Sequence, residues 1–338
     1  MLSKASDIRI SSSIRQQPSP MISLSTYSPS DAPQWDALVS QSKNGTFLLK
    51  RAFMDYHSDR FTDCSLMFEK KGRTVGLLPA NYVESEQIVC SHQGLTYGGL
   101  ILDKTVTATD VMEMFDLMSS YYSKELNASR LIYKPVPYIY CSYPSDEDRY
   151  AVFRHEGRLT VSNIAAVIDM KVPLPYTELR RRCIKKGEKA GLQVMRTHDS
   201  ADYRTYCNLL STCLESRHHA TPVHSADEML LLQERFPEDI ALYVCKSSEG
   251  ELLAGTWLFI SRNVVHTQYL ANSDTGKDVG ALDLIIHHII SNSNFSRRYL
   301  DFGTSNEQQG RYLNEQLAFQ KEGFGGRGVC YDTWEIHL

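Results

Sequence analysis

The chain has 338 residues, of which 42% are hydrophobic and 22% charged, and its formal net charge is −4. This composition is typical of a globular protein with room for two domains. The slightly acidic balance argues against broad coating of nucleic acids, and no segment approaches the roughly 18 apolar residues of a membrane span.

The N-terminal segment and the cysteines bear on processing and location. Residues 1–20 are rich in Ser and lack the apolar run of a secretory signal, so we expect a disordered leader or an over-long gene start. The eight cysteines are scattered without a C-x-x-C pair. This usage favours reduced thiols in a cytoplasmic protein.

From residue 22 onwards the predicted elements occur twice in the same order. Each copy has a strand–glycine turn–strand unit (68–77 and 245–257) and a further strand (95–102 and 264–270). A helix with apolar residues at 3–4 spacing and a short strand (130–134 and 298–302) then follow. We interpret this order as a duplicated α/β unit. Two unrelated α/β segments with similar hairpins are the alternative.

A boundary is expected near residues 157–171, where 160–170 reads as a strand linking the copies. The sequence therefore predicts an α/β fold with a mixed sheet, an N-terminal domain at 21–156 and a C-terminal domain at 157–338. Residues 176–190 predict a helix that ends at Gly191, where a left-handed cap belongs.

That helix is strongly basic between Arg180 and Lys189, which suits a phosphate or an RNA backbone. A solvated helix face is the alternative, with Glu178 and Glu188 as partial partners.

Residues 272–280 are expected to form a loop before a helix N-terminus, a geometry that binds phosphate groups. Lys277, Gly280 and Ala281 partly match the pyrophosphate loop of acyl-CoA-dependent acetyltransferases. The match is incomplete, because Leu282 occupies the last place.

Two residues near the C-terminus are candidates for catalysis. Asp301 ends a predicted buried strand, where it could act as a general base or orient an amine, or could only satisfy the turn at Gly303. Lys321 precedes a glycine-rich turn, where it could stabilise an oxyanion or lie exposed at a helix end.

The histidines give weaker signals. His218, His219 and His224 lack the spacing and partners of a metal site, so we expect no metal. His266 lies in a predicted strand, where a structural histidine is the simplest interpretation.

Four segments together resemble the Fem-type branch of the GNAT acyltransferase superfamily. They are residues 185–192, 252–257, 299–303 and 319–325, and residues 217–225 also resemble a segment of Fem-like proteins. The resemblance implies tandem GNAT-like domains that transfer an acyl or aminoacyl group to an amine. It implies catalytic roles for Asp301 and Lys321, and substrate contacts at His57, Arg217, His218, Tyr269 and Ser305.

His57 stands where the family has a second lysine, and the helical arm of some Fem proteins is absent here. The first hypothesis is an N-acyltransferase with acyl-CoA (acetyl-CoA) as donor, acting on a small-molecule or peptide amine between the domains. Aminoacyl-tRNA, bound along the basic helix, is the alternative donor, with a cell-wall precursor as acceptor. A catalytically silent binding module is the second hypothesis.

Overall fold

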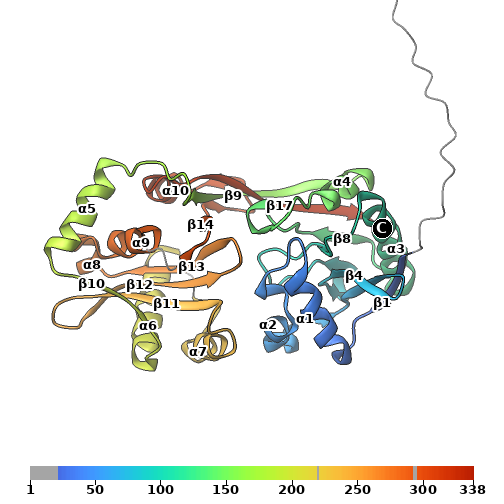
Figure 1. The fold of residues 1–338 in the computed structure, drawn as a ribbon, viewed down its shortest axis with the longest axis horizontal. Coiled ribbons are helices and arrows are strands. Elements are labelled where there is room, and N and C mark those ends of the chain that lie inside the picture. Colours follow the sequence, from blue (N-terminus) through green and yellow to red (C-terminus); the bar gives the residue numbers. More distant parts are fainter. Residues whose placement is uncertain (1–21, 219–220, 292–294) are drawn as a thin grey trace, which may run out of the picture.

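The computed structural model describes residues 22–338 except 219–220 and 292–294, so the predicted leader lies outside the described residues. We call residues 22–156 the N-terminal half and 157–338 the C-terminal half; the boundary itself stays a prediction. Figure 1 shows the halves side by side, with the long strands β9 (Arg158–Asp169) and β17 (Arg327–His337) running between them.

The N-terminal half combines a small sheet with part of a larger one. The small sheet has the order β1-β3-β4-β7. The strands of this half are β1 (Ile22–Thr26), β2 (Thr62–Asp63), β3 (Leu66–Lys70), β4 (Arg73–Leu78), β5 (Asn81–Val83), β6 (Ile88–Cys90), β7 (Ile101–Leu102) and β8 (Arg130–Tyr133). Its α-helices are α1 (Ala32–Gln41), α2 (Arg51–Met54), α3 (Ala108–Glu125) and α4 (Glu147–Arg154).

The C-terminal half is built around antiparallel strands with helices on both faces (Figure 1). Its remaining strands are β10 (Gln193–Thr197), β11 (Ile240–Lys246), β12 (Leu252–Ile260), β13 (Val264–Asn272), β14 (Tyr299–Thr304), β15 (Asn306–Glu307) and β16 (Tyr312–Leu313). Its α-helices are α5 (Glu178–Lys189), α6 (Ser200–His218), α7 (Ala226–Arg235), α8 (Asp274–Val279), α9 (Ala281–Ser291) and α10 (Glu315–Glu322).

The larger sheet joins the two halves through the last strand of the chain. Its order is β10-β11-β12-β13-β14-β9-β17-β8-β6-β5-β2. Residues 327–335 of β17 pair with β9, and residues 334–337 pair on the other edge with β8 of the N-terminal half. The C-terminus therefore completes the sheet of the N-terminal half, which the sequence did not predict.

The predicted α/β fold with a mixed sheet is confirmed, and most repeated elements are present in both halves. The hairpins β3–β4 and β11–β12 turn through left-handed glycines, Gly72 (φ 71°) and Gly250 (φ 87°). Helix α5 ends before Gly191, also left-handed at φ 68°, as expected.

The prediction of one repeated strand is wrong. Of residues 95–102, only 101–102 form a strand, β7. The N–H groups of Gly98 and Gly99 both donate to the Lys134 carbonyl, and a Cβ on Gly98 would lie 2.2 Å from the Ser91 carbonyl oxygen. These close backbone approaches fold the segment into a loop. The counterpart of β13 in the N-terminal half is instead β6. Strand β13 pairs in parallel with β14, the strand after α9, and β6 pairs in parallel with β8, the strand after α3.

An apolar core shared by the halves fixes them against each other. Phe47 of the N-terminal half packs on Phe236 and Phe259 of the C-terminal half, with ring centroids 5.5 and 5.4 Å apart. Aromatic rings bury large apolar areas and prefer such tilted or edge-on contacts. The interface is therefore packed like a protein core.

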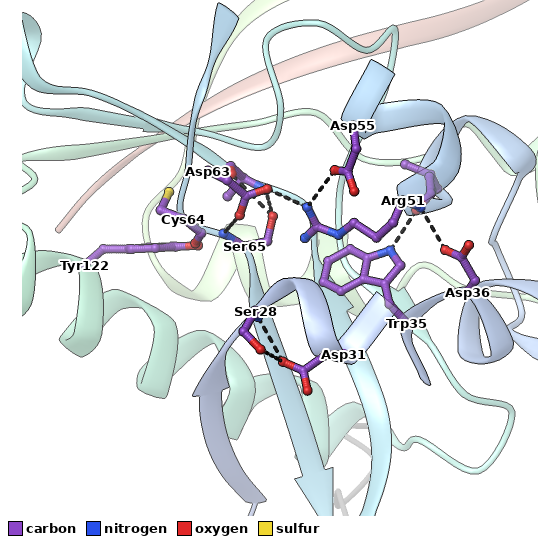
Figure 2. A network of polar contacts seen from close by, with 12 residues as sticks. Ser28, Asp31, Trp35, Asp36, Arg51, Asp55, Asp63, Cys64, Ser65 and Tyr122 are labelled. Carbon is purple, nitrogen blue, oxygen red and sulfur yellow. Dashed lines mark hydrogen bonds and ion pairs between the residues drawn. The ribbon is translucent and has the colours of Figure 1, made fainter. Parts of the chain in front are cut away.

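A buried arginine organises the start of the N-terminal half (Figure 2). The Arg51 guanidinium lies 3.4 Å from the centroid of the Tyr27 ring and 4.0 Å from that of Trp35. Its Nη1 pairs with the Asp63 carboxylate, and Asp55 is 3.7 Å away. Cation–π and ionic contacts thus offset the burial of this charge.

Candidate functional site

Strands β13 and β14 run in parallel and then separate, which creates an opening in the sheet. The parallel pairs are Val264 with Tyr299, Val265 with Leu300, and finally His266 with Asp301. Beyond this last pair, Gly303 adopts a left-handed conformation (φ 70°). His266 and Asp301 therefore lie side by side at the point where the strands diverge, in the region where open α/β sheets place ligands.

Asp301 is fully buried and accepts four hydrogen bonds. The donors are the Tyr140 hydroxyl (2.8 Å), the Tyr331 hydroxyl (2.5 Å), His266 Nδ1 (2.9 Å) and the Gly303 N–H (2.8 Å). Burial alone would raise the pKa of Asp301, but the charge and hydrogen bond of His266, with the Tyr331 and Gly303 donors, hold that pKa below its usual value. Asp301 is thus an ionised carboxylate with its acceptor sites occupied.

The contact with Asp301 sets the tautomer of His266. An ionised carboxylate only accepts hydrogen bonds, so Nδ1 carries a hydrogen, and whenever the ring is neutral its Nε2 is the proton acceptor. The His266 side chain is 14% exposed and lines a narrow pocket with Tyr97, Tyr140 and Phe259. Tyr97 and Tyr140 come from the N-terminal half, so both halves form this pocket.

The sequence alone predicted a structural histidine at position 266 and did not predict its contact with Asp301. Only the register of β13 against β14 brings His266 to Asp301, 35 positions along the chain. The sequence does show a histidine and an aspartate on consecutive buried strands, which could have indicated a pair. It does not show how the two strands align, and this alignment decides whether the two side chains meet.

Lys321 of α10 contacts the same end of β14. Its Nζ donates to the carbonyl oxygens of Gly303 (3.0 Å) and Thr304 (2.7 Å). The side chain is buried, and burial lowers its pKa to about 8. Next to this contact lies Ser305, also buried, whose Oγ has no hydrogen-bond partner among the described residues. The structure thus brings Asp301, Lys321 and Ser305 to one strand end.

The predicted pyrophosphate segment is not an open loop. Residues 274–279 form the short helix α8, and Lys277 pairs with Asp274 at 2.5 Å. Gly280 lies against α5, where a Cβ would be 2.2 Å from the Cys183 carbonyl oxygen, and Ala281 is fully buried. Helix α5 therefore covers the backbone that the sequence assigned to a phosphate.

His57 and Tyr269 lie in one aromatic cluster between the halves, although they do not touch Asp301. His57 stacks on Tyr56 at 4.3 Å between ring centroids, Tyr56 stacks on His224 at 6.3 Å, and His224 Nδ1 lies 3.0 Å from the Tyr269 hydroxyl. Burial lowers the pKa of His57, and its Nδ1 has no partner within the described residues. The backbones of Arg217 and His218 are in α6, but their side chains lie outside the described part of the chain.

The basic helix α5 has two faces. Arg180 faces inwards, 2.8 Å from Asp283 and over the Phe324 ring at 5.1 Å. Four other cations are exposed and form no ion pair with any described residue: Arg182, Lys185, Lys186 and Lys189. This exposed face could bind a polyanion. In the described residues no helix is long and apolar enough to cross a bilayer.

Comparisons with known proteins agree with this architecture. Residues 179–312 match the family model of an acetyltransferase (GNAT) domain. The fold is similar to that of FemX (12% identity, 94% of this chain and 97% of that chain, TM-score 0.67). It is also similar to the C-terminal domain of a putative lysylphosphatidylglycerol synthetase from Agrobacterium fabrum (11% identity, 91% of each chain, TM-score 0.58).

A third similar structure is L-PGS from Bacillus licheniformis (11% identity, 90% of this chain and 91% of that chain, TM-score 0.58). No curated protein sequence matches the chain significantly. The tandem GNAT-like fold that the resemblance implied is confirmed. Residues 179–312 therefore match a GNAT acetyltransferase domain, and nearly the whole chain has a fold similar to that of FemX.

Proposed function

We propose that the protein is an acyltransferase that moves an acyl group from a donor to an amine at the opening between β13 and β14. The observation that carries the proposal is the His266–Asp301 pair, joined at 2.9 Å in a pocket formed by both halves. A histidine oriented by a buried carboxylate is a common general base. The GNAT domain match supplies the reaction class.

The pair has a direct part in the reaction. The amine nitrogen attacks the acyl carbonyl carbon, a C–N bond forms, and His266 Nε2 takes the proton that the nitrogen releases. The oxyanion then collapses, the bond to the donor breaks, and the leaving group departs with its electron pair and receives the proton from His266. Because Asp301 is fully buried, it acts as a positioning residue for the imidazole. The remaining N–H of Lys321 steadies the oxyanion.

The donor is an acyl thioester of CoA or an aminoacyl ester of tRNA. The covering of Gly280 by α5 disfavours the expected CoA pyrophosphate contact. The exposed cations of α5 suit the backbone of an RNA. The name of one structural neighbour, lysylphosphatidylglycerol synthetase, also describes an aminoacyl product. These observations support aminoacyl-tRNA over acyl-CoA.

In the test, the full-length chain is incubated with one donor at a time, either acetyl-CoA or a mixture of charged tRNAs. Hydroxylamine and a panel of primary amines serve as acceptors. Mass spectrometry measures the acylated amine. We expect product with charged tRNA, abolished in His266→Ala and retained in His337→Ala, a control at an exposed histidine of β17. Product with acetyl-CoA alone would reverse the choice of donor. No product with either donor, or full activity in His266→Ala, would contradict the proposal and favour a silent binding module.

A further inference from the structure

A second pocket lies beside the one that contains His266, and both halves form its walls. Its cavity volume is about 240 Å³. The N-terminal half contributes Lys50 and the segment around Gly45, and the C-terminal half contributes Asp239, Arg262 and Arg297. Phe47 and Ser261 line both pockets. A ligand in this pocket would therefore contact both halves next to the candidate active site.

The pocket carries more positive than negative charge. Lys50, Arg262 and Arg297 line it, and Asp239 is the one carboxylate among its lining residues. None of the three cations forms an ion pair with a described residue. Burial raises the pKa of Asp239, against the lowering by Lys50 and Arg297. One carboxylate offsets three cations only in part. The excess is local, because the chain as a whole has a net charge of −4.

Internal contacts hold two of these cations in place. Arg262 donates from Nη1 to Ser142 Oγ (2.9 Å) and from Nη2 to the Ser40 carbonyl oxygen (2.7 Å), which ties the β12–β13 turn to the N-terminal half. Arg297 donates from Nε to the Ser261 carbonyl oxygen at 2.7 Å. Its two Nη groups make no hydrogen bond to a described residue. Those groups, and the Lys50 ammonium, remain able to bind a ligand.

Two guanidinium groups held by internal contacts, together with one lysine ammonium, suit a multiply charged oxyanion. Arginine matches phosphate oxygens with two parallel N–H donors, and lysine adds a point charge. Of the three cations, Arg262 makes the contacts that join the halves, whereas the Lys50 ammonium and the Arg297 Nη groups have no hydrogen-bond partner among the described residues.

We propose that this pocket binds the phosphate group of a small phosphorylated ligand, held by Lys50, Arg262 and Arg297 across the two halves. The inference does not depend on the acyl-transfer proposal, because it concerns binding and its test needs no turnover. If both proposals hold, the phosphate would anchor a substrate whose reacting end lies towards His266.

The test measures binding to the full-length chain by isothermal titration and by thermal unfolding. The probes are inorganic phosphate, pyrophosphate and ADP at constant ionic strength, with succinate as a dicarboxylate control. We expect at least one phosphate probe to bind and to raise the midpoint of thermal unfolding, and succinate to have less effect. Pyrophosphate or ADP binding without inorganic phosphate would indicate a ligand with a larger phosphorylated group.

The variants locate the site. Lys50→Met, whose ammonium makes no ion pair with a described residue, should raise the dissociation constant about tenfold, and Arg297→Met should do the same. Lys71→Met, at the exposed turn of the β3–β4 hairpin, is the matched control and should bind as the unmodified chain does. The proposal is overturned if no phosphate probe binds at millimolar concentration, or if Lys50→Met and Lys71→Met bind equally well. Far-ultraviolet circular dichroism checks that each variant folds.

Discussion

The two halves contain the same pair of parallel strands but use the space beyond it differently. In the C-terminal half, the last pair of β13 and β14 is His266 with Asp301. In the N-terminal half, the last pair of β6 and β8 is Cys90 with Ile132, and neither residue is suited to accept a proton near neutral pH.

The opening of the N-terminal half is also closed by its own chain. The loop after β6 folds back there, and Lys134 Nζ donates to the carbonyl oxygens of His92 (2.8 Å) and Leu95 (2.5 Å). Each half contains a largely buried lysine (Lys134 and Lys321) and a buried carboxylate, but Asp148 of the N-terminal half lies on α4, whereas Asp301 lies on β14. A catalytic arrangement requires the histidine at the open strand end, which the C-terminal half alone has at this position.

The buried carboxylates give the largest expected contrast. Asp301→Asn should lower the transfer rate roughly 10²- to 10⁴-fold, because an amide no longer fixes the His266 tautomer. Asp148→Asn is the matched change in the N-terminal half, where the carboxylate is also buried and accepts from the Tyr133 hydroxyl at 2.7 Å. It should leave the rate unchanged. Equal losses in steady-state assays of the two variants would show that Asp301 acts only through stability.

The two lysines come next. Burial lowers the pKa of both Lys321 and Lys134 to about 8. Lys321→Met should reduce the rate roughly 10- to 100-fold through loss of oxyanion stabilisation, whereas Lys134→Met should affect stability alone.

The same pKa values predict two effects of pH. The rate should decline as pH rises through about 8, because the Lys321 ammonium is lost, and Lys321→Arg should move this decline to higher pH. In the unfolded chain both lysines have a pKa near 10.5, so below pH 8 the burial of two ammonium groups lowers the free energy of unfolding. This free energy should rise between pH 8 and 10.5, where the folded chain loses these protons first. A pH–rate profile without a change in Lys321→Arg would remove Lys321 from the mechanism.

Two left-handed glycines give a contrast in stability alone, with no expected effect on the chemical step. Gly72→Ala, at a turn with open space around it (φ 71°), should cost about 1 kcal/mol of unfolding free energy through backbone strain. Gly280→Ala (φ 80°) should cost roughly 2–4 kcal/mol, because the new methyl group would meet the Cys183 carbonyl oxygen and displace α5. Urea unfolding measures both. A similar cost at the two positions would mean that α5 is only loosely docked there.

Part of the site could be predicted from sequence because its signals are local. Asp301 and Lys321 lie in short segments that resemble a known family, and the structure brings both to the end of β14. The roles of His57 and Tyr269 stay predictions, since these residues lie in a separate aromatic cluster. The phosphate loop at Gly280 was predicted from residues 272–280 alone. These residues do not show that α5, about 90 positions earlier in the chain, packs over Gly280.

Elements whose causes lie within a few residues could be predicted from the sequence. Glycines that reach positive φ set the hairpin turns at Gly72 and Gly250, and Gly191 ends α5. Tertiary structure alone decided the pairing of β17 with β8 and of His266 with Asp301. Those contacts depend on strand order and register, which are set when distant segments bury their apolar faces together, and a one-residue shift would separate His266 from Asp301.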